Sequence, residues 1–161
     1  MSEPFFVDST SELISLNEML KISGLEFVQG ILEGKYSAPP ISQTLNFWLH
    51  SAEKGRVVFR GAPQYSSLNP MGGVHGGWYG TLLDSTMSCA VQTMQPAGSG
   101  YTTLEFKTNI TRAIPVGMEI EAIGTIQHSG RSTGVAEGII RGVEDGKTYA
   151  TGLATCLVLK P

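Results

Sequence analysis

Residues 69–84 read NPMGGVHGGWYGTLLD, and five glycines surround the single histidine of this stretch, His75. A cluster of glycines with a proline is typical of a loop. The apolar residues that follow, from Trp78 to Met94, recur at the spacing of a helix that buries one side. The sequence therefore predicts a loop over 69–77 and one long helix over 77–95, which the segment Pro96 to Gly100 ends.

The chain on either side of this helix is predicted to be mostly short strands. The four segments after it alternate apolar and polar residues: TLEFKTNIT, MEIEAIGTIQ, TGVAEGIIRG and TYATGLATCLVL. In the first of them we expect Leu104, Phe106 and Ile110 on one side and Thr103 on the other. Two short strands, in TLNFWLH and GRVVFRG, precede the loop, and SAPPIS (37–42) is expected to be extended because proline disfavours helix.

The order of these elements predicts the fold class. Residues 10–33 show helical spacing with a break at Ser23-Gly24, and the strands and the long helix follow. Helices kept apart from an antiparallel sheet indicate an α+β fold. A long central helix wrapped by a curved antiparallel sheet is the hotdog fold. We therefore expect an N-terminal helical extension over 1–35 and a hotdog domain over 36–161.

Composition excludes several classes of protein. The 161 residues carry a formal net charge of -3, and the 11 basic residues are thinly spread, which argues against nucleic-acid binding. No apolar run reaches membrane-spanning length, and no secretory signal is visible, so the cytoplasm is the expected compartment. We expect Cys89 and Cys156 to be reduced, buried thiols, and no spacing of residues indicates a metal site.

The glycines and Asp84 raise a chemical possibility. The N-terminus of a helix carries unpaired N–H groups that can hold a polarised carbonyl oxygen, and Gly76-Gly77 would let a ligand approach them. Asp84 lies eight residues further on, about 12 Å along a helix axis, so one helix cannot bring Gly76 and Asp84 to one reacting atom. Two antiparallel copies of the helix could do so across a two-fold axis.

A stripe of small or polar residues at helical spacing supports such an arrangement: Gly77, Gly80, Thr81, Asp84 and Ser88. Plainer interpretations exist for each candidate taken alone. The glycines could only shape a turn, and Asp84 could lie on a solvated helix face. His75 could orient the loop by hydrogen bonds, and Asn69 could be an ordinary turn residue before Pro70.

Taken together, these segments resemble a known family. The loop and helix, with YTTLEFKTNITRAIPVGMEIEAIG and HSGRSTGVAEGIIRG, resemble the hotdog-fold acyl-CoA thioesterases of the phenylacetate-pathway (PaaI) type over about residues 36–159. The resemblance implies hydrolysis of an acyl-CoA to a free acid and CoA. It also implies a homodimer with shared active sites, which could pair further into a tetramer. It implies no metal or cofactor beyond the CoA of the substrate.

The resemblance also implies roles for single residues. The N–H of Gly76 would polarise the thioester carbonyl, and Asp84 would act as nucleophile or as general base. Asn69 and His75 would orient the thioester, and Thr103 would help to place the water. The substrate would also meet a second set of residues: Gly77, Trp78, Ser88, Arg131 and Ser132.

One departure from the family pattern and two rival functions remain open. Trp78-Tyr79 stands where the family often has a small or aliphatic residue, so the acyl group is not determined. One rival is a hotdog hydratase or dehydratase acting on enoyl thioesters. The other is a non-catalytic acyl-CoA-binding hotdog protein, since fold alone does not fix function.

Overall fold

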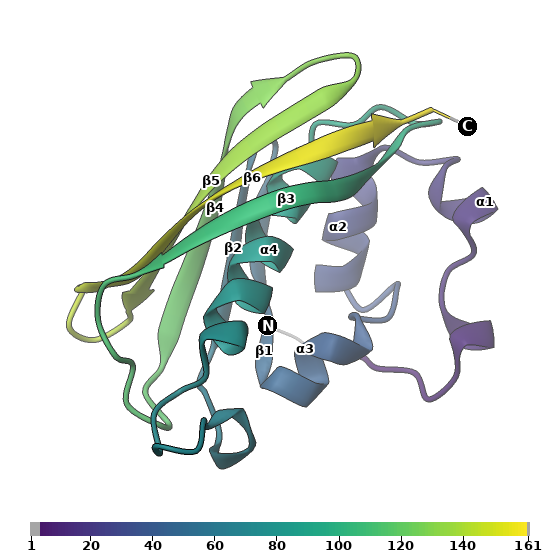
Figure 1. The fold of residues 1–161 in the computed structure, drawn as a ribbon. Helices are drawn as coiled ribbons and strands as arrows, with labels where there is room; N and C mark the ends of the chain where they lie inside the picture. Colours follow the sequence, from purple (N-terminus) through teal and green to yellow (C-terminus); the bar gives the residue numbers. More distant parts are fainter. Residues whose placement is uncertain (1–3, 161) are drawn as a thin grey trace.

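The long helix of the sequence prediction is α4, which spans Gly76–Gln92 in a computed structural model that describes residues 4–160. A six-stranded sheet wraps this helix (Figure 1). The strands are β1 (Phe47–Glu53), β2 (Arg56–Gly61), β3 (Gly100–Ile110), β4 (Ile120–Ser129), β5 (Thr133–Gly142) and β6 (Thr148–Leu159). This arrangement confirms the predicted α+β hotdog fold.

The sheet is antiparallel throughout, in the order β1-β2-β4-β5-β6-β3, so β1 and β3 are its edges. Its inner face packs closely on α4. A Cβ at Gly124 of β4 would overlap the carbonyl oxygen of Thr86, and one at Gly138 of β5 would press into Leu83 and Met87. These two strand glycines therefore leave room for α4, for its backbone at Gly124 and for its side chains at Gly138.

Short helices make up the N-terminal region. They are η1 (Thr10–Glu12), α1 (Leu16–Met19) and α2 (Gly24–Leu32), drawn in purple in Figure 1. The predicted break at Ser23-Gly24 is the start of α2, where Ser23 and Glu26 form a capping box. α2 packs on the body of the protein, because Gln29 Nε2 donates to the carbonyl of Ala52 at 3.2 Å.

The prediction for residues 37–42 was wrong in part. The structure has a helix, α3, over Pro40–Leu45. Proline suits the first position of a helix, where its missing N–H has no partner to lose, and Pro40 takes that position. Asn46 ends the helix in the left-handed conformation (φ 54°), so the strand begins at Phe47 and Leu45 belongs to the helix.

The prediction for the sides of β3 was also wrong in part, because it placed Thr103 on the opposite side from Phe106. The pairing of β3 with β6 shifts between Thr103 and Glu105, which marks a β-bulge at Leu104. Thr103 and Phe106 therefore both face α4: Thr103 bonds to Asp84, and the Phe106 ring lies against Gly80. Leu104 is left 57% exposed.

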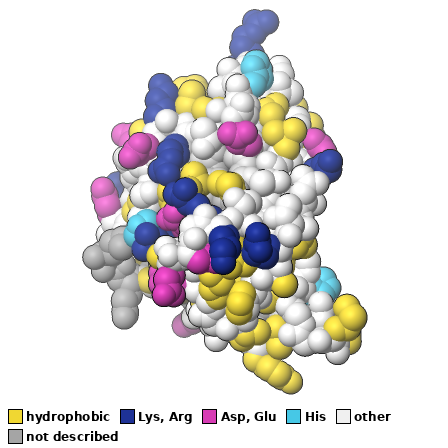
Figure 2. Space-filling view, turned by 90° about the vertical axis from the view of Figure 1, so that its left-hand side faces the viewer, with side chains coloured by type: hydrophobic (Ala, Val, Ile, Leu, Met, Phe, Trp, Pro, Cys, Tyr) yellow, Lys and Arg dark blue, Asp and Glu magenta, His cyan; other side chains and the backbone are white. Residues whose placement is uncertain are grey.

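A short 3-10 helix, η2 (Tyr65–Ser67), precedes the glycine-rich loop at the lowest part of Figure 1. Figure 2 shows hydrophobic side chains gathered at the lower end of the face that it presents, with basic and acidic side chains both present above them. Within residues 4–160, no helix is long and apolar enough to cross a membrane.

Candidate active site

The glycine-rich loop is shaped by Asn69. Its Oδ1 accepts hydrogen bonds from the N–H groups of Met71 (2.9 Å) and Gly73 (3.2 Å), and its own N–H donates to the carbonyl of Gly73 (2.8 Å). A side-chain oxygen that bonds to the backbone two residues on is the usual way in which Asn closes a turn. Asn69 therefore fixes the loop that leads into α4.

His75 caps the helix. Its Nδ1 accepts a hydrogen bond from the N–H of Gly77 at 2.9 Å, and its carbonyl accepts one from Trp78. The ring therefore carries its proton on Nε2 whenever it is neutral. Among the described residues, the N–H of Gly76 has no acceptor, and Gly76 itself is exposed. The partial positive charge of the helix end is thus available there to a bound oxygen.

Asp84 and Thr103 form the second part of the site. Thr103 Oγ1 donates to Asp84 Oδ1 at 3.0 Å, and the carboxyl group is half-buried between α4 and β3. Burial raises the pKa of Asp84 above its usual value, although the hydrogen bond from Thr103 lowers it in part. A carboxylate with a raised pKa is a better acceptor of a proton from water.

Three residues of the small and polar stripe of α4 lie against β3 of the same chain: Gly80, Asp84 and Ser88. From the N-terminal end, Gly80 meets Phe106 and Asp84 meets Thr103. One turn further on, Ser88 Oγ accepts a hydrogen bond from Tyr101 at 3.1 Å. Tyr101 is a residue that the sequence reasoning did not single out. Its position two residues before Thr103 on one strand was the available signal.

Trp78 and Tyr79 lie in the core. Each is 2% exposed, and their rings meet edge to face at 5.9 Å. The Trp78 indole N–H donates to the carbonyl of Leu45 (2.8 Å), and the Tyr79 hydroxyl accepts from the N–H of Ile114 (2.8 Å). The bulky pair therefore anchors the start of α4 against α3 and the loop before β4.

Arg131 and Ser132 lie elsewhere. Both are exposed in the turn between β4 and β5. Gly134, just after this turn, lies against Val91 near the C-terminal end of α4. Gly76 is at the opposite end of the helix. The structure therefore does not bring Arg131 or Ser132 to Gly76 within one chain.

Gly76 and Asp84 are also apart within one chain. Both belong to the uninterrupted helix α4, so about 12 Å of axial rise separates them. One subunit thus has an unpaired N–H at one end of the stripe and a carboxylate in its middle. No group of three His, Cys, Asp or Glu in the described part of the chain could hold a metal ion.

The comparisons with known proteins include a family match over the region of α4. The family model described as "Thioesterase superfamily" matches residues 71–149, which include α4 and the Asp84–Thr103 pair. The comparison with curated proteins found no match.

Solved structures share the fold. The PaaI protein of the Escherichia coli phenylacetic acid degradation operon is 20% identical, with a TM-score of 0.74, covering 85% of this chain and 96% of that one. A putative thioesterase related to phenylacetic acid degradation, from Ralstonia eutropha, is 25% identical, with a TM-score of 0.73 and coverage of 81% and 98%. A Streptococcus mutans protein bound to acetyl-CoA is 27% identical, with a TM-score of 0.66 and coverage of 71% and 90%.

The matched segment contains the end of the glycine-rich loop, the helix α4 and the half-buried carboxyl group of Asp84. The fold around them is similar to that of the PaaI protein. Residues 71–149 therefore match the thioesterase superfamily, and the chain as a whole is similar to hotdog-fold thioesterases of the PaaI-like type.

Proposed function

We propose that the protein hydrolyses an acyl-CoA thioester to a free acid and CoA, at a site that two subunits share. Asp84 of one subunit and the N–H of Gly76 of the partner subunit act on the same thioester. The observation that carries the proposal is the Asp84 carboxyl group, half-buried, with a raised pKa and held by Thr103. The bound acetyl-CoA of the Streptococcus mutans neighbour supports a CoA ester as the ligand.

The chemistry follows from the two groups. In the general-base route, Asp84 takes a proton from water, and the water oxygen bonds to the carbonyl carbon. The negative charge then moves to the carbonyl oxygen, where the Gly76 N–H stabilises it by about 3 kcal/mol. The carbon–sulfur bond breaks as the oxyanion collapses, and the CoA sulfur takes up the proton. In the nucleophilic route, Asp84 attacks the carbon itself, and the carbon–sulfur bond breaks as CoA leaves as the thiolate. Water then hydrolyses the resulting anhydride, which frees the acid and the Asp84 carboxylate, and the thiolate takes up a proton from that water.

The other predicted residues support these two. Asn69 and His75 hold the loop so that the Gly76 N–H stays free, and Thr103 orients the carboxyl group. Gly77 leaves room at the helix start, and Ser88 continues the stripe one turn beyond Asp84. We assign Arg131 and Ser132 to the phosphates of CoA. Trp78 acts indirectly, by fixing the start of α4 from the core.

The edge of the sheet supports a homodimer. β3 is an edge strand, and its exposed residues include Leu104, Phe106 and Ile110. An unpaired edge with apolar side chains is a ready site for pairing with another chain. Because β3 covers the stripe of α4, a second copy at this edge would lie beside Asp84. Such an isologous dimer makes two equivalent sites.

Thiol release from a panel of acyl-CoA esters tests the activity, with the variant Asp84→Ala beside the natural protein. We expect the turnover number of Asp84→Ala to fall at least about 100-fold, the scale expected for a positioned base. Circular dichroism must show that the variant is folded. Absorbance of an enoyl-CoA separates hydrolysis from hydration, which consumes the double bond without releasing thiol. Normal turnover in a folded Asp84→Ala protein would rule out the mechanism.

A further inference from the structure

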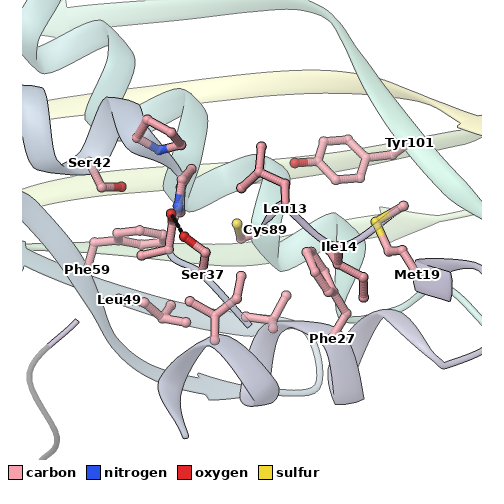
Figure 3. A pocket seen from close by; sticks show the side chains of 15 residues that line it. Leu13, Ile14, Met19, Phe27, Ser37, Ser42, Leu49, Phe59, Cys89 and Tyr101 are labelled. Carbon is pink, nitrogen blue, oxygen red and sulfur yellow. Dashed lines mark hydrogen bonds between the residues drawn. The ribbon is translucent and has the colours of Figure 1, made fainter. Parts of the chain in front are cut away.

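A pocket of about 350 Å³ lies between the N-terminal segment (residues 13–42) and the body of the protein (Figure 3). The N-terminal segment contributes Leu13, Ile14 and Phe27 to its wall. The body contributes Phe59 of β2, Cys89 of α4 and Tyr101 of β3. The wall is mostly hydrocarbon, so the pocket suits an apolar group.

The pocket begins close to the proposed catalytic carboxylate. Tyr101 and Thr103 are two residues apart on β3, and they bond to Ser88 and Asp84, which are one turn apart on α4. Four residues of helix span about 6 Å. An acyl chain whose carbonyl carbon reacts beside Asp84 is therefore within reach of the pocket wall.

Three side-chain hydroxyl groups line the pocket that would hold such a chain, and they differ in their hydrogen-bond partners. Ser37 Oγ donates to the carbonyl of Ala38 at 2.8 Å, and the Tyr101 hydroxyl donates to Ser88. Ser42 is 2% exposed, and its Oγ has no hydrogen-bond partner in the described part of the chain. A buried hydroxyl without a partner costs free energy, and a ligand that bonds to it removes that cost.

We propose that this pocket binds the acyl group of the thioester, and that Ser42 hydrogen-bonds an oxygen substituent on that group. The inference rests on the proposed function. A dry cavity of roughly 150 Å³ already binds benzene. The pocket therefore has room for a medium-chain or aryl-substituted acyl group, and its one unpaired hydroxyl selects a hydroxy or oxo derivative. The N-terminal segment is then the part of the chain that sets acyl specificity.

The side chains that line the pocket are uncharged, which suits an apolar ligand. Burial raises the pKa of the Cys89 thiol to about 12, so the thiol stays neutral at the pH of the cell. None of the other side chains named on the wall carries a formal charge.

The test compares kcat/KM for octanoyl-CoA and acetyl-CoA in the natural protein, in Ile14→Trp, and in Ile41→Trp as a control. Ile14 lines the pocket, whereas Ile41 lies on α3, is 45% exposed and does not line it. We expect Ile14→Trp to lower the ratio of octanoyl to acetyl activity at least about 10-fold, because the indole fills the pocket. Ile41→Trp should leave the ratio unchanged. A folded Ile14→Trp protein with an unchanged ratio overturns the assignment, and Leu13→Phe serves if Ile14→Trp does not fold.

Ser42→Ala tests the polar contact, with 3-hydroxyoctanoyl- and 8-hydroxyoctanoyl-CoA compared with octanoyl-CoA. We expect the natural protein to have a higher kcat/KM for one of the hydroxylated esters than for octanoyl-CoA. In Ser42→Ala the ratio of these two values should fall by about 5- to 10-fold, the scale of one hydrogen bond. Equal preference in both proteins overturns the role of Ser42.

Calorimetric binding of octanoate to the full chain separates this inference from the proposed function. If no ester is hydrolysed but octanoate binds to the natural protein and not to Ile14→Trp, the pocket stands and the hydrolase mechanism fails. If octanoyl-CoA is hydrolysed and Ile14→Trp changes neither the ratio nor octanoate binding, the pocket assignment fails and the mechanism stands.

Discussion

The Asp84 carboxyl group is subject to two opposing effects, burial and a hydrogen bond. A carboxylate prefers water, but α4 and β3 half-bury it, and only the hydrogen bond from Thr103 offsets part of that cost. The raised pKa means that the folded protein holds the proton more tightly than the unfolded chain does. As a base, Asp84 must be ionised, so the rate of hydrolysis should rise with pH through this raised pKa.

The same shift gives a prediction for stability. A raised folded-state pKa contributes stability below the unfolded pKa, and this contribution is lost as pH rises through the folded pKa. The ionised Asp84 is therefore destabilising at neutral pH. We expect Asp84→Asn to have a higher melting temperature than the natural protein at pH 7, and the difference to shrink towards about pH 3.9, where an ordinary Asp gains its proton. Melting curves at both pH values check this. A lower melting temperature for Asp84→Asn at pH 7 would contradict it.

Some of the site was visible in the sequence at the level of single residues. Asn69 before Pro70 signals a turn, and Gly76-Gly77 was predicted to lie at the start of the helix, because these features are local. A role for Thr103 was expected only through the family resemblance, as a residue that helps to place the water, and its hydrogen bond to Asp84 was not predicted. Ser42 could not be identified, because its surroundings depend on how the N-terminal segment packs on the body.

The start of α4 is the part of the fold on which the proposed oxyanion role of Gly76 depends. At its first position the backbone N–H is free, and the preceding residue, His75, has extended backbone angles (φ -64°, ψ 139°). Those angles are the ones that a residue before proline prefers, and proline is well suited to the first turn of a helix. A proline at position 76 can thus remove the N–H while the helix keeps its start.

We therefore expect Gly76→Pro to lower the turnover number by about 100- to 1,000-fold, the scale for losing one oxyanion donor. The matched control is Gly76→Ala, which keeps the N–H. Its Cβ would meet only the Ile110 side chain, at an ordinary contact distance of 3.5 Å. Thiol release and circular dichroism on both variants check the prediction. If folded Gly76→Pro hydrolyses the substrate at the natural rate, the oxyanion role is wrong.

The elements differ in how well the sequence predicted them. α4 and the four strands from β3 to β6 have long, regular patterns, and they were predicted within a few residues. α3 was missed because proline, which disfavours a helix interior, is well suited to the first position of a helix. The bulge at Leu104 was missed because one extra residue reverses the sides of a strand without changing its composition.

In the molecule as a whole, the N-terminal segment is joined closely to the body. The N–H of Gly24 donates to the carbonyl of Gln95, and a Cβ at Gly24 would overlap the carbonyl of Gln92. α2 therefore packs on the C-terminal end of α4, and together they leave the pocket of Figure 3 between them and the sheet. The division of the chain at residue 35 stays a prediction.

The proposed shared active site would be a property of a dimer, and it permits a complementation test. Asp84→Ala and Gly76→Pro should each be nearly inactive as homodimers. Under the proposal each site takes its carboxylate and its N–H from different chains, so in a mixed dimer one site carries both defects and the other carries neither. About half of the sites in mixed dimers should then work, if assembly is random and both chains fold.

Co-refolding the two variants and measuring thiol release checks this expectation. Different affinity tags on the two chains show how much mixed dimer is present. The reason to expect recovery is the axial distance of about 12 Å between Gly76 and Asp84 on the unbroken helix α4, which prevents one chain from supplying both groups to one carbonyl. If each site lay within a single chain, every site in the mixture would carry one defect. An inactive mixture that demonstrably contains mixed dimer would therefore rule out the shared site, and it would leave Asp84 to act without the N–H of its partner's helix.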